Sequence, residues 1–283
     1  MAITRREFLK KGLQSIVGIL GLSGVSYLYA RYIEPEMLTF QHYTLRDEKI
    51  PASFDDFKIL QFSDTHLGFH YDEPSFSRLV TSVQDQQPDL IVFTGDLVDD
   101  PDSYAFRPNL PRLLRKFEAP YGKFWIYGNH DHGGYGTEKI KELMTDGGFQ
   151  LLQNEHQLIT KDEDAFALAG VDDFLLGKPD LDAALAPIQK QVFTILLAHE
   201  PDSADQVRHY PVDVQLSGHS HGGQIQLPFF GHLVTPPMAE KYVEGQYQVE
   251  GLDLFVSRGI GTTRLPYRFL CRPEVSVFHL KSS

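Results

Sequence analysis

The sequence of 283 residues contains a single cysteine, Cys271, so an internal disulfide framework is excluded and the core alone must hold the fold. Basic residues are outnumbered, with 26 Lys and Arg against 38 Asp and Glu and a net charge of −12. This deficit of positive charge argues against a surface that binds nucleic acid through its phosphates. A smaller phosphate-bearing substrate is still possible, because cations bound among the carboxylates would outweigh their negative charge at the site.

Low-complexity segments and internal repeats are also lacking. Hydrophobic residues make up 42% and charged residues 23% of the chain, which is the range of globular proteins with a sizeable core. The length suits one large α/β domain.

Residues 1–34 have the pattern of an export signal. Arg5-Arg6 is followed by an apolar pair and Lys10, the order of twin-arginine signals, and then by a weakly apolar stretch, residues 12–30. An ordinary amphipathic helix is the alternative. We expect export by the twin-arginine machinery, which places the protein in the cell wall, in the medium or on the outer face of the membrane. The stretch ends in a poor cleavage site, so a cleaved and a retained signal both stay open.

The rest of the chain alternates strand and helix patterns. Residues 35–56 are irregular and read as a linker or an initial strand, and residues 57–283 as the catalytic domain. Strands are expected at 57–62, 89–93, 123–127, 165–171, 192–198, 212–216, 254–257 and 275–280, and helices at 75–87, 110–117 and 137–145. Such alternation predicts βαβ units, and the closely spaced late strands predict a second sheet in a layered α/β sandwich.

Each of the first three strands ends in a polar cluster. These clusters are Asp64-Thr65-His66, Gly95-Asp96-Leu97-Val98-Asp99 and Gly128-Asn129-His130-Asp131. They are roughly 30 residues apart, the length of one βαβ unit, so they should meet at the carboxyl edge of one sheet. Two later strands end similarly, at His199-Glu200-Pro201 and at Gly218-His219-Ser220-His221.

The residue types in these clusters indicate a metal centre. Carboxylate, imidazole and one amide, without thiolate, favour Mn, Fe, Zn or Co over copper(I). One aspartate can bridge two cations, as two-metal hydrolases require. Taken singly, an Asp-x-His pair could be a helix cap, and His199 a core histidine. Five such clusters in order, each after an apolar strand, favour two divalent cations.

The order Asp-x-His, Gly-Asp-x-x-Asp, Gly-Asn-His-Asp, a lone His and Gly-His-x-His resembles the calcineurin-like metallophosphoesterase superfamily over residues 57–280. The twin-arginine start, Gly-His-Ser-His-Gly-Gly and the tail from Ser257-Arg258-Gly259 to Arg272-Pro273-Glu274 resemble its YkuE-like bacterial branch, which is related to UDP-2,3-diacylglucosamine pyrophosphatases and envelope phosphodiesterases. The resemblance implies a four-layer α/β/β/α sandwich.

The resemblance also implies a role for each residue. One cation would be held by Asp64, His66, Asp96 and His221, and the other by Asp96, Asn129, His199 and His219, with Asp96 bridging. His130 would meet the substrate phosphate, and Asp131 would hydrogen-bond His130 and fix its tautomer. Asp99 has a weaker claim, since a loop position or a supporting contact to a ligand is as consistent as a catalytic role.

The expected function is hydrolysis of a phosphodiester or pyrophosphate by metal-activated water, on a small-molecule, lipid or cell-wall substrate of the envelope. A phosphomonoesterase is the first alternative, and a non-catalytic metal-binding scaffold is the second. Candidate anchors for a second phosphate are Arg258, Arg264 and Arg268, for which an ion-paired surface role is equally consistent. Phe229 and Phe230 could pack a lipid or sugar, although a core role is favoured.

Overall fold

The computed structural model describes residues 14, 21, 23–106, 108–132 and 136–283. Arg5 and Arg6 of the expected export signal lie outside the described residues. Residues 23–28 are helical and continue into a π-helical turn, Tyr29–Ile33. Within the described parts of the chain, no helix is long and apolar enough to cross a membrane.

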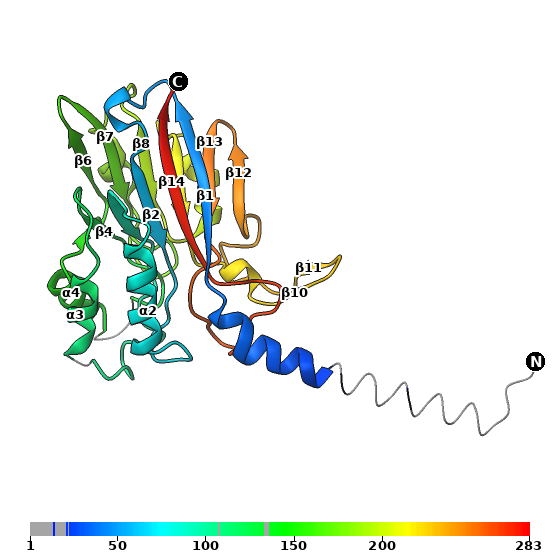
Figure 1. Ribbon diagram of the computed structural model, residues 1–283. Helices are drawn as coiled ribbons and strands as arrows, with labels where there is room; N and C mark the ends of the chain where they lie inside the picture. The colour runs from blue at the N-terminus through cyan, green and yellow to red at the C-terminus, as the bar shows by residue number, and fades with distance from the viewer. Residues whose placement is uncertain (1–13, 15–20, 22, 107, 133–135) are drawn as a thin grey trace, which may run out of the picture.

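The first of two six-stranded sheets has the order β1-β14-β2-β3-β4-β5. Its strands are β1 (Thr39–Asp47), β14 (Glu274–Ser282), β2 (Lys58–Phe62), β3 (Leu90–Phe93), β4 (Lys123–Trp125) and β5 (Gln150–Leu151). Neighbours are parallel except for β14 and β2, which are antiparallel. The last strand thus lies between the first two, and β1 occupies part of the segment expected to be a linker or initial strand (Figure 1).

Three helices cover the outer face of this sheet, namely α2 (Glu73–Gln84), α3 (Asn109–Arg115) and α4 (Gly136–Asp146). Helix α2 begins where the Asp72 carboxylate accepts a hydrogen bond of 2.8 Å from the backbone N–H of Ser75. It buries Phe76, Leu79, Val80 and Val83, whose spacing of three and four residues makes one apolar stripe. That stripe packs in a core shared with β2, β3 and β4.

The second sheet has the order β12-β13-β9-β8-β7-β6. Its strands are β12 (Gly245–Val249), β13 (Leu252–Val256), β9 (Val214–Ser217), β8 (Thr194–Leu197), β7 (Asp164–Gly170) and β6 (Glu155–Lys161). The four inner strands are parallel, and the two edge strands are antiparallel to their neighbours. Helices α5 (Leu181–Leu185) and α6 (Ala204–Val207) pack on its outer face.

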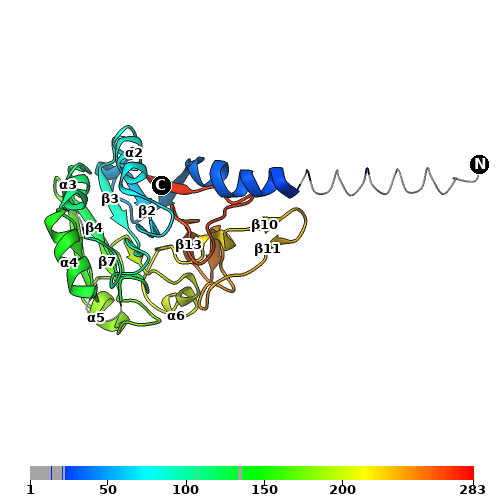
Figure 2. The same cartoon turned by 90° about the horizontal axis from the view of Figure 1, so that it is seen from below.

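A separate hydrophobic core fills the space between the two sheets. Phe278 of β14 meets Phe255 of β13 there, with ring centroids 5.0 Å apart, and Phe166 of β7 packs against Phe54 and Phe57. The layers therefore run helix, sheet, sheet, helix, and the expected α/β/β/α sandwich is confirmed (Figures 1 and 2).

One short hairpin belongs to neither sheet. Strands β10 (Gln226–Leu227) and β11 (Gly231–His232) pair antiparallel and project beside the N-terminal helical segment (Figure 2). That segment is tied to the loop of residues 262–273. Backbone N–H of Arg268 donates to Ala30 O at 3.0 Å, and Glu34 accepts hydrogen bonds from the backbone of Leu270 and Cys271.

Candidate metal centre

The clustered polar residues lie directly after strand ends, on turns of left-handed backbone. The φ angles are 55° at Asp64, 43° at His66, 62° at Asp96, 69° at His219 and 50° at His221. Non-glycine residues adopt this region at a cost of about 1–3 kcal/mol each. Such a concentration of strain after β2, β3 and β9 is typical of a functional site, where packing holds side chains in one orientation.

Two glycines permit the close approach of these turns. A Cβ at Gly128 would lie 2.3 Å from Oδ1 of Asp96, and a Cβ at Gly218 would lie 2.4 Å from Oδ2 of Asp64. Any side chain at either position would displace the carboxylates. These glycines are therefore required by the packing of the site itself.

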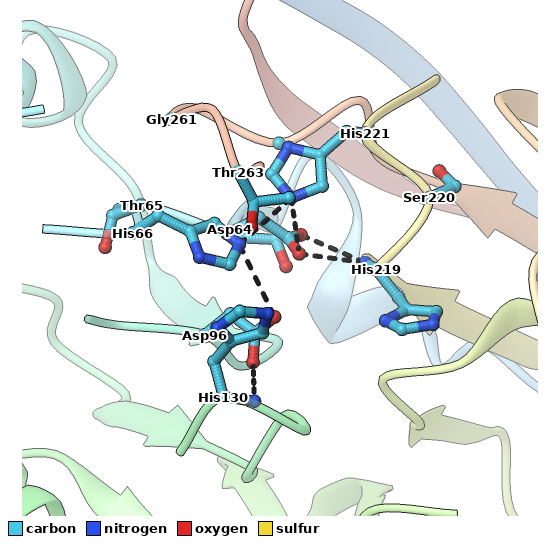
Figure 3. Close-up of polar contacts among 12 residues, drawn as sticks. Asp64, Thr65, His66, Asp96, His130, His219, Ser220, His221, Gly261 and Thr263 are labelled. Carbon is cyan, nitrogen blue, oxygen red and sulfur yellow. Dashed lines mark hydrogen bonds and ion pairs between the residues drawn. The ribbon is translucent and has the colours of Figure 1, made fainter. Parts of the chain in front are cut away.

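The first cluster comprises Asp64, His66 and His221 (Figure 3). The Nε2 atoms of the two histidines lie 3.0 Å apart, and Nε2 of His221 is 3.5 Å from Oδ1 of Asp64. Asp64 is held by the backbone N–H of His219, which donates to both of its carboxylate oxygens at 3.0 and 3.1 Å. Two imidazole nitrogens and a carboxylate oxygen thus converge on one point.

The second cluster comprises Asp96, His199 and His219. Oδ2 of Asp96 lies 3.3 Å from Nε2 of His199 and 3.5 Å from Nε2 of His66 in the first cluster. The Asp96 carboxylate therefore stands between the two clusters. This is the position that a carboxylate bridging two cations must take.

The ring nitrogens that do not face the centre are fixed by hydrogen bonds. Nδ1 of His199 donates to Thr94 O at 2.6 Å, and Nε2 of His219 donates to Pro237 O at 2.8 Å. Nδ1 of His66 lies 3.1 Å from Oδ1 of Asp99. These contacts leave Nε2 of His199, Nδ1 of His219 and Nε2 of His66 as lone-pair donors towards the centre, which is how metal-binding histidines are oriented.

Two buried polar atoms at the centre have no hydrogen-bond partner among the described residues, namely Oδ1 of Asn129 and Nε2 of His199. A buried acceptor without a partner costs free energy of folding, and coordination of its lone pair to a bound cation would remove that cost. Carboxylates, imidazoles and an amide oxygen are also the donors that borderline divalent cations take. The residues present fit two divalent cations.

The charges of the buried groups depend on one another. Burial opposes ionisation of Asp96, but His199 and His130 outweigh it and hold the pKa of Asp96 well below its usual value. Burial lowers the pKa of His219 to about 4, with a further contribution from His199. Burial, followed by the proximity of His66, also lowers the pKa of His221 well below its usual value. His219 and His221 are thus neutral, as metal ligands must be. Burial opposes protonation of His199, but Asp96 outweighs it and raises the pKa of His199 well above its usual value, so His199 would release a proton on binding a cation.

His130 and Asp131 are arranged differently from the expectation. Among the described residues, no hydrogen bond joins the carboxylate of Asp131 to the His130 ring; the carboxylate accepts hydrogen bonds from the backbone of Asp96, Leu97 and Gly128 at 2.7–3.0 Å. Nδ1 of His130 instead donates to the backbone carbonyl of Asp99 at 2.5 Å. The expected pairing of Asp131 with His130 is therefore wrong.

Asp99, for which a loop position and a supporting role were both left open above, connects several parts of the site. Its backbone orients His130, and its carboxylate accepts from Nδ1 of His66 and, at 3.2 Å, from the hydroxyl of Thr263. Burial opposes its ionisation, but His66 lowers the pKa of Asp99 below its usual value. The second aspartate of the Gly-Asp-x-x-Asp motif was the sequence signal for this role, because the turn after β3 brings it back to the same edge of the sheet.

The three candidate arginines do not lie together. Arg268 is fully buried, and its guanidinium donates to the backbone carbonyls of Arg258, Gly259, Gly261 and Cys271, so it does not fit the role of a phosphate anchor. Arg258 is paired with Glu274 at 2.6 Å. Arg264 alone borders the pocket above the metal centre.

Ser220 stands in a Gly-x-Ser-x-Gly pattern, residues 218–222, which in other folds carries a nucleophile. Its hydroxyl is buried and donates to Val243 O at 2.5 Å, pointing away from the carboxylates (Figure 3). It is therefore a structural residue of the turn between His219 and His221.

A pocket of about 540 Å³ opens above the centre. Its floor contains His66, Asp96, Asn129, His130, His219 and His221. Its walls are mostly apolar and include Leu175, Leu176, Ile225, Leu233, Val234 and Leu265. A larger hollow of about 1140 Å³ lies beside α2 but contains none of these floor residues, so the smaller pocket is the one that opens on the metal centre.

Comparison with known proteins agrees with this geometry. Residues 57–223 match the calcineurin-like phosphoesterase family, and the chain belongs to that family. It is therefore a metal-dependent hydrolase of phosphoric esters. The family expectation stated from the motifs is confirmed at this level.

Individual relatives are similar along almost the whole chain. The chain is 47% identical to metallophosphoesterase YkuE of Bacillus subtilis (strain 168), over 99% of each chain. It is 30% identical to phosphodiesterase YaeI of Escherichia coli (strain K12), over 98% of this chain and 99% of that one. A metallophosphoesterase of Aquifex aeolicus (strain VF5) is 30% identical to this chain, over 88% of this chain and 94% of that one.

Among solved structures, phosphopantetheinyl hydrolase of Mycobacterium tuberculosis matches 72% of this chain and 90% of its own at 12% identity, with a TM-score of 0.46.

Proposed function

We propose that this chain is an exported phosphodiesterase or pyrophosphatase of the cell envelope that works with two divalent cations. The observation that carries the proposal is the Asp96 carboxylate, which stands between a cluster of Asp64, His66 and His221 and a cluster containing His199 and His219. Asn129 would complete the second cluster with its unpartnered amide oxygen. When bound, the cations supply Lewis-acid activation of water and of the phosphate group.

The chain's own residues orient the reaction. His130 donates from Nδ1 to Asp99 O, so its Nε2 is the nitrogen free to reach into the pocket that it lines. Burial opposes protonation of His130, but Asp96 outweighs it and raises its pKa. A protonated His130 can donate to a phosphate oxygen or to the leaving oxygen.

The pocket favours a substrate with groups on both sides of the phosphorus. Its apolar walls come from two separate segments of the chain, one with Leu175 and Leu176 and the other with Leu233 and Val234. A bare phosphomonoester would leave most of this surface without contact. Arg264 at the pocket edge can bind a second phosphate of a pyrophosphate. The similarity to YaeI, named a phosphodiesterase, supports the same reading.

The proposed location rests on the sequence. Arg5-Arg6 and the weakly apolar residues 12–30 form the twin-arginine pattern. This route accepts folded proteins, and a chain that must load cations before crossing a membrane benefits from it. The proposed substrate is therefore a phosphorylated small molecule, lipid or cell-wall component outside the cytoplasm.

Turnover of two aryl esters tests the reaction. Bis(p-nitrophenyl) phosphate and p-nitrophenyl phosphate should be compared with Mn added, with Asp96→Asn as the control that loses the metal. Faster hydrolysis of the diester supports the proposal, and faster hydrolysis of the monoester would reassign the protein as a phosphomonoesterase. Absence of turnover with both esters in a metal-loaded protein would favour a scaffold.

A further inference from the structure

The tip of the β10–β11 hairpin carries large apolar side chains in water. Phe229 is fully exposed and Phe230 is 83% exposed, although a core role was expected for both. The flanking residues Leu227, Leu233 and Val234 are exposed as well. Contiguous apolar groups in this number are unfavourable in water unless something covers them, so they mark an interaction surface.

A second loop extends this surface. Backbone N–H of Gln226 donates to Phe269 O at 2.8 Å, which joins the hairpin to the loop of residues 262–273. That loop exposes Leu265 and Leu270. We call the seven side chains together the apolar rim: Leu227, Phe229, Phe230, Leu233, Val234, Leu265 and Leu270.

The N-terminal helical segment lies against the same loop. Tyr27 contacts Tyr267 with ring centroids 5.6 Å apart, and Figure 2 shows the segment and the hairpin leaving the body on the same side. Val25, Leu28 and Ile33 of the segment are also exposed. The rim is thus continuous with a stretch whose sequence is itself weakly apolar.

The charge of this region differs from that of the whole chain. No Asp or Glu occurs in residues 214–239 or 254–273, although the chain has 38 acidic residues and a net charge of −12. The second stretch contains four arginines, of which Arg264 and Arg272 have no carboxylate ion pair among the described residues. Among the carboxylates that reach these stretches from elsewhere, Glu34 and Glu244 accept hydrogen bonds from the Leu270 backbone and from Gln226. An apolar surface flanked by free arginines suits contact with anionic lipid headgroups.

The rim is also the mouth of the substrate pocket. Leu233, Val234 and Leu265 are at once exposed rim residues and walls of the pocket whose floor holds the metal centre. Whatever covers the rim therefore lies next to the opening through which substrate enters. We propose that the apolar rim docks on a lipid bilayer and admits a phosphoester whose lipid part stays in the membrane. The lipid substrate rests on the proposed function, whereas the docking does not.

Fluorescent labels on the full chain test the docking directly. Phe229→Cys labelled with an environment-sensitive dye reports on the hairpin, and the same dye at Leu158→Cys, an exposed position on β6, is the matched control. Native Cys271 is buried, so labelling is restricted to the introduced thiol. With vesicles of phosphatidylcholine containing about one part in four phosphatidylglycerol, the hairpin label should shift to the blue and the control label should not.

A paired substitution tests the consequence. Phe229→Ser/Phe230→Ser should reduce vesicle binding by about tenfold or more, because burying each phenyl side chain is favourable by at least that factor. Turnover of a soluble aryl diester should be unchanged, whereas turnover of a phosphodiester lipid in vesicles should fall; Leu158→Ser should change neither.

Three results would overturn the docking: a bound protein whose hairpin label stays in water, equal vesicle binding by the double variant, or a rim covered by a second copy of the chain in solution. Failure of the soluble diester alone would count against the proposed function and leave the docking intact.

Discussion

The carboxylate of Asp131 accepts a hydrogen bond of 2.7 Å from the backbone N–H of Asp96, the residue that stands between the two clusters. It also accepts from Leu97 and Gly128 at 3.0 Å, so one buried side chain ties the turn after β3 to the turn after β4. Asp131 therefore positions the bridging carboxylate through its backbone. Among the described residues, no hydrogen bond joins it to the His130 ring, so it has no direct share in proton transfer.

Asp131→Asn tests this positioning role. An amide replaces one acceptor oxygen with an NH2 group, which faces backbone donors that need an acceptor, so we expect a loss of about 2–3 kcal/mol in the free energy of unfolding. Urea unfolding in the presence of a chelator measures this loss separately from metal binding. Metal affinity should fall too, because the turn carrying Asp96 loosens. Unchanged stability together with normal metal content would contradict the role.

Asp172 gives a prediction on pH. Burial opposes its ionisation, but hydrogen bonds from His132 at 2.7 Å and from the Lys178 backbone outweigh it and lower its pKa to about 2. A carboxyl group with a lowered folded-state pKa stabilises the fold above its unfolded value near 4 and loses that contribution as the pH falls towards 2. Wild-type chain should therefore lose more stability than Asp172→Asn between pH 5 and pH 2, measured by thermal unfolding. Parallel curves for the two proteins would refute the assignment.

The sequence predicted the buried parallel strands best. Runs such as residues 89–93 and 192–198 are apolar on both faces, and the structure places β3 and β8 within them. The edge strands β6 and β12 were missed because their exposed faces are polar and their alternation is irregular. Strand β5 has only two residues, too few for any periodicity.

At the site, the sequence predicted which residues come together, because the carboxyl ends of neighbouring parallel strands must meet. It did not predict how their ring nitrogens are oriented. The partners of His199 and His219 are the backbone carbonyls of Thr94 and Pro237, distant in sequence and without a side-chain signature. For the same reason the sequence did not predict that Asp99, and not Asp131, holds the His130 ring. Both aspartates follow strand ends at similar spacing, so the motif alone does not distinguish them.

Arg264 and Arg258 provide a matched pair for the second phosphate. Arg264→Ala should raise KM for a pyrophosphate substrate by about tenfold and leave metal content unchanged, because a charge-assisted contact at the pocket edge is lost. Arg258→Ala should instead lower stability, because it leaves Glu274 buried without its partner. Steady-state kinetics and thermal unfolding of both variants decide the matter. Equal KM values for Arg264→Ala and wild type would remove Arg264 from the substrate site.

Arg5→Lys/Arg6→Lys tests the proposed export route. Because twin-arginine signals are read by a receptor that requires the guanidinium pair, we expect the double variant to stay in the cytoplasm. Cell fractionation of the full-length chain measures this. Arg31→Lys, outside the motif, is the control and should be exported normally. Normal amounts of the double variant outside the membrane would exclude the twin-arginine pathway.

The last prediction separates the residues that hold the cations from the one that faces the substrate. Asp96→Asn removes the negative charge between the two clusters, so both cations should be lost together with activity and part of the stability. His130 is not a member of either three-residue cluster that Asp96 joins, and its ring is held from outside by Asp99 O. Its backbone N–H donates to Oδ1 of Asp96 at 2.8 Å, a contact that alanine retains. Metal content should then stay near normal while turnover falls by about 10²–10⁴-fold, the effect of losing a general acid or charge stabiliser.

The leaving group distinguishes these two roles of His130. If its Nε2 protonates the leaving oxygen, His130→Ala should be impaired less with an aryl ester, whose leaving group needs no proton, than with an alkyl ester. If it only stabilises charge on the phosphoryl oxygens, both esters should lose activity equally. Metal analysis by mass spectrometry and rates with both esters are needed for each variant.

His66 and His130 pack edge to face with ring centroids 4.6 Å apart, so a third group of His66, Asp99 and His130 could also hold a cation. Loss of metal from His130→Ala as complete as from Asp96→Asn would show that His130 is itself a ligand, and the acid of the reaction would have to be sought elsewhere in the pocket.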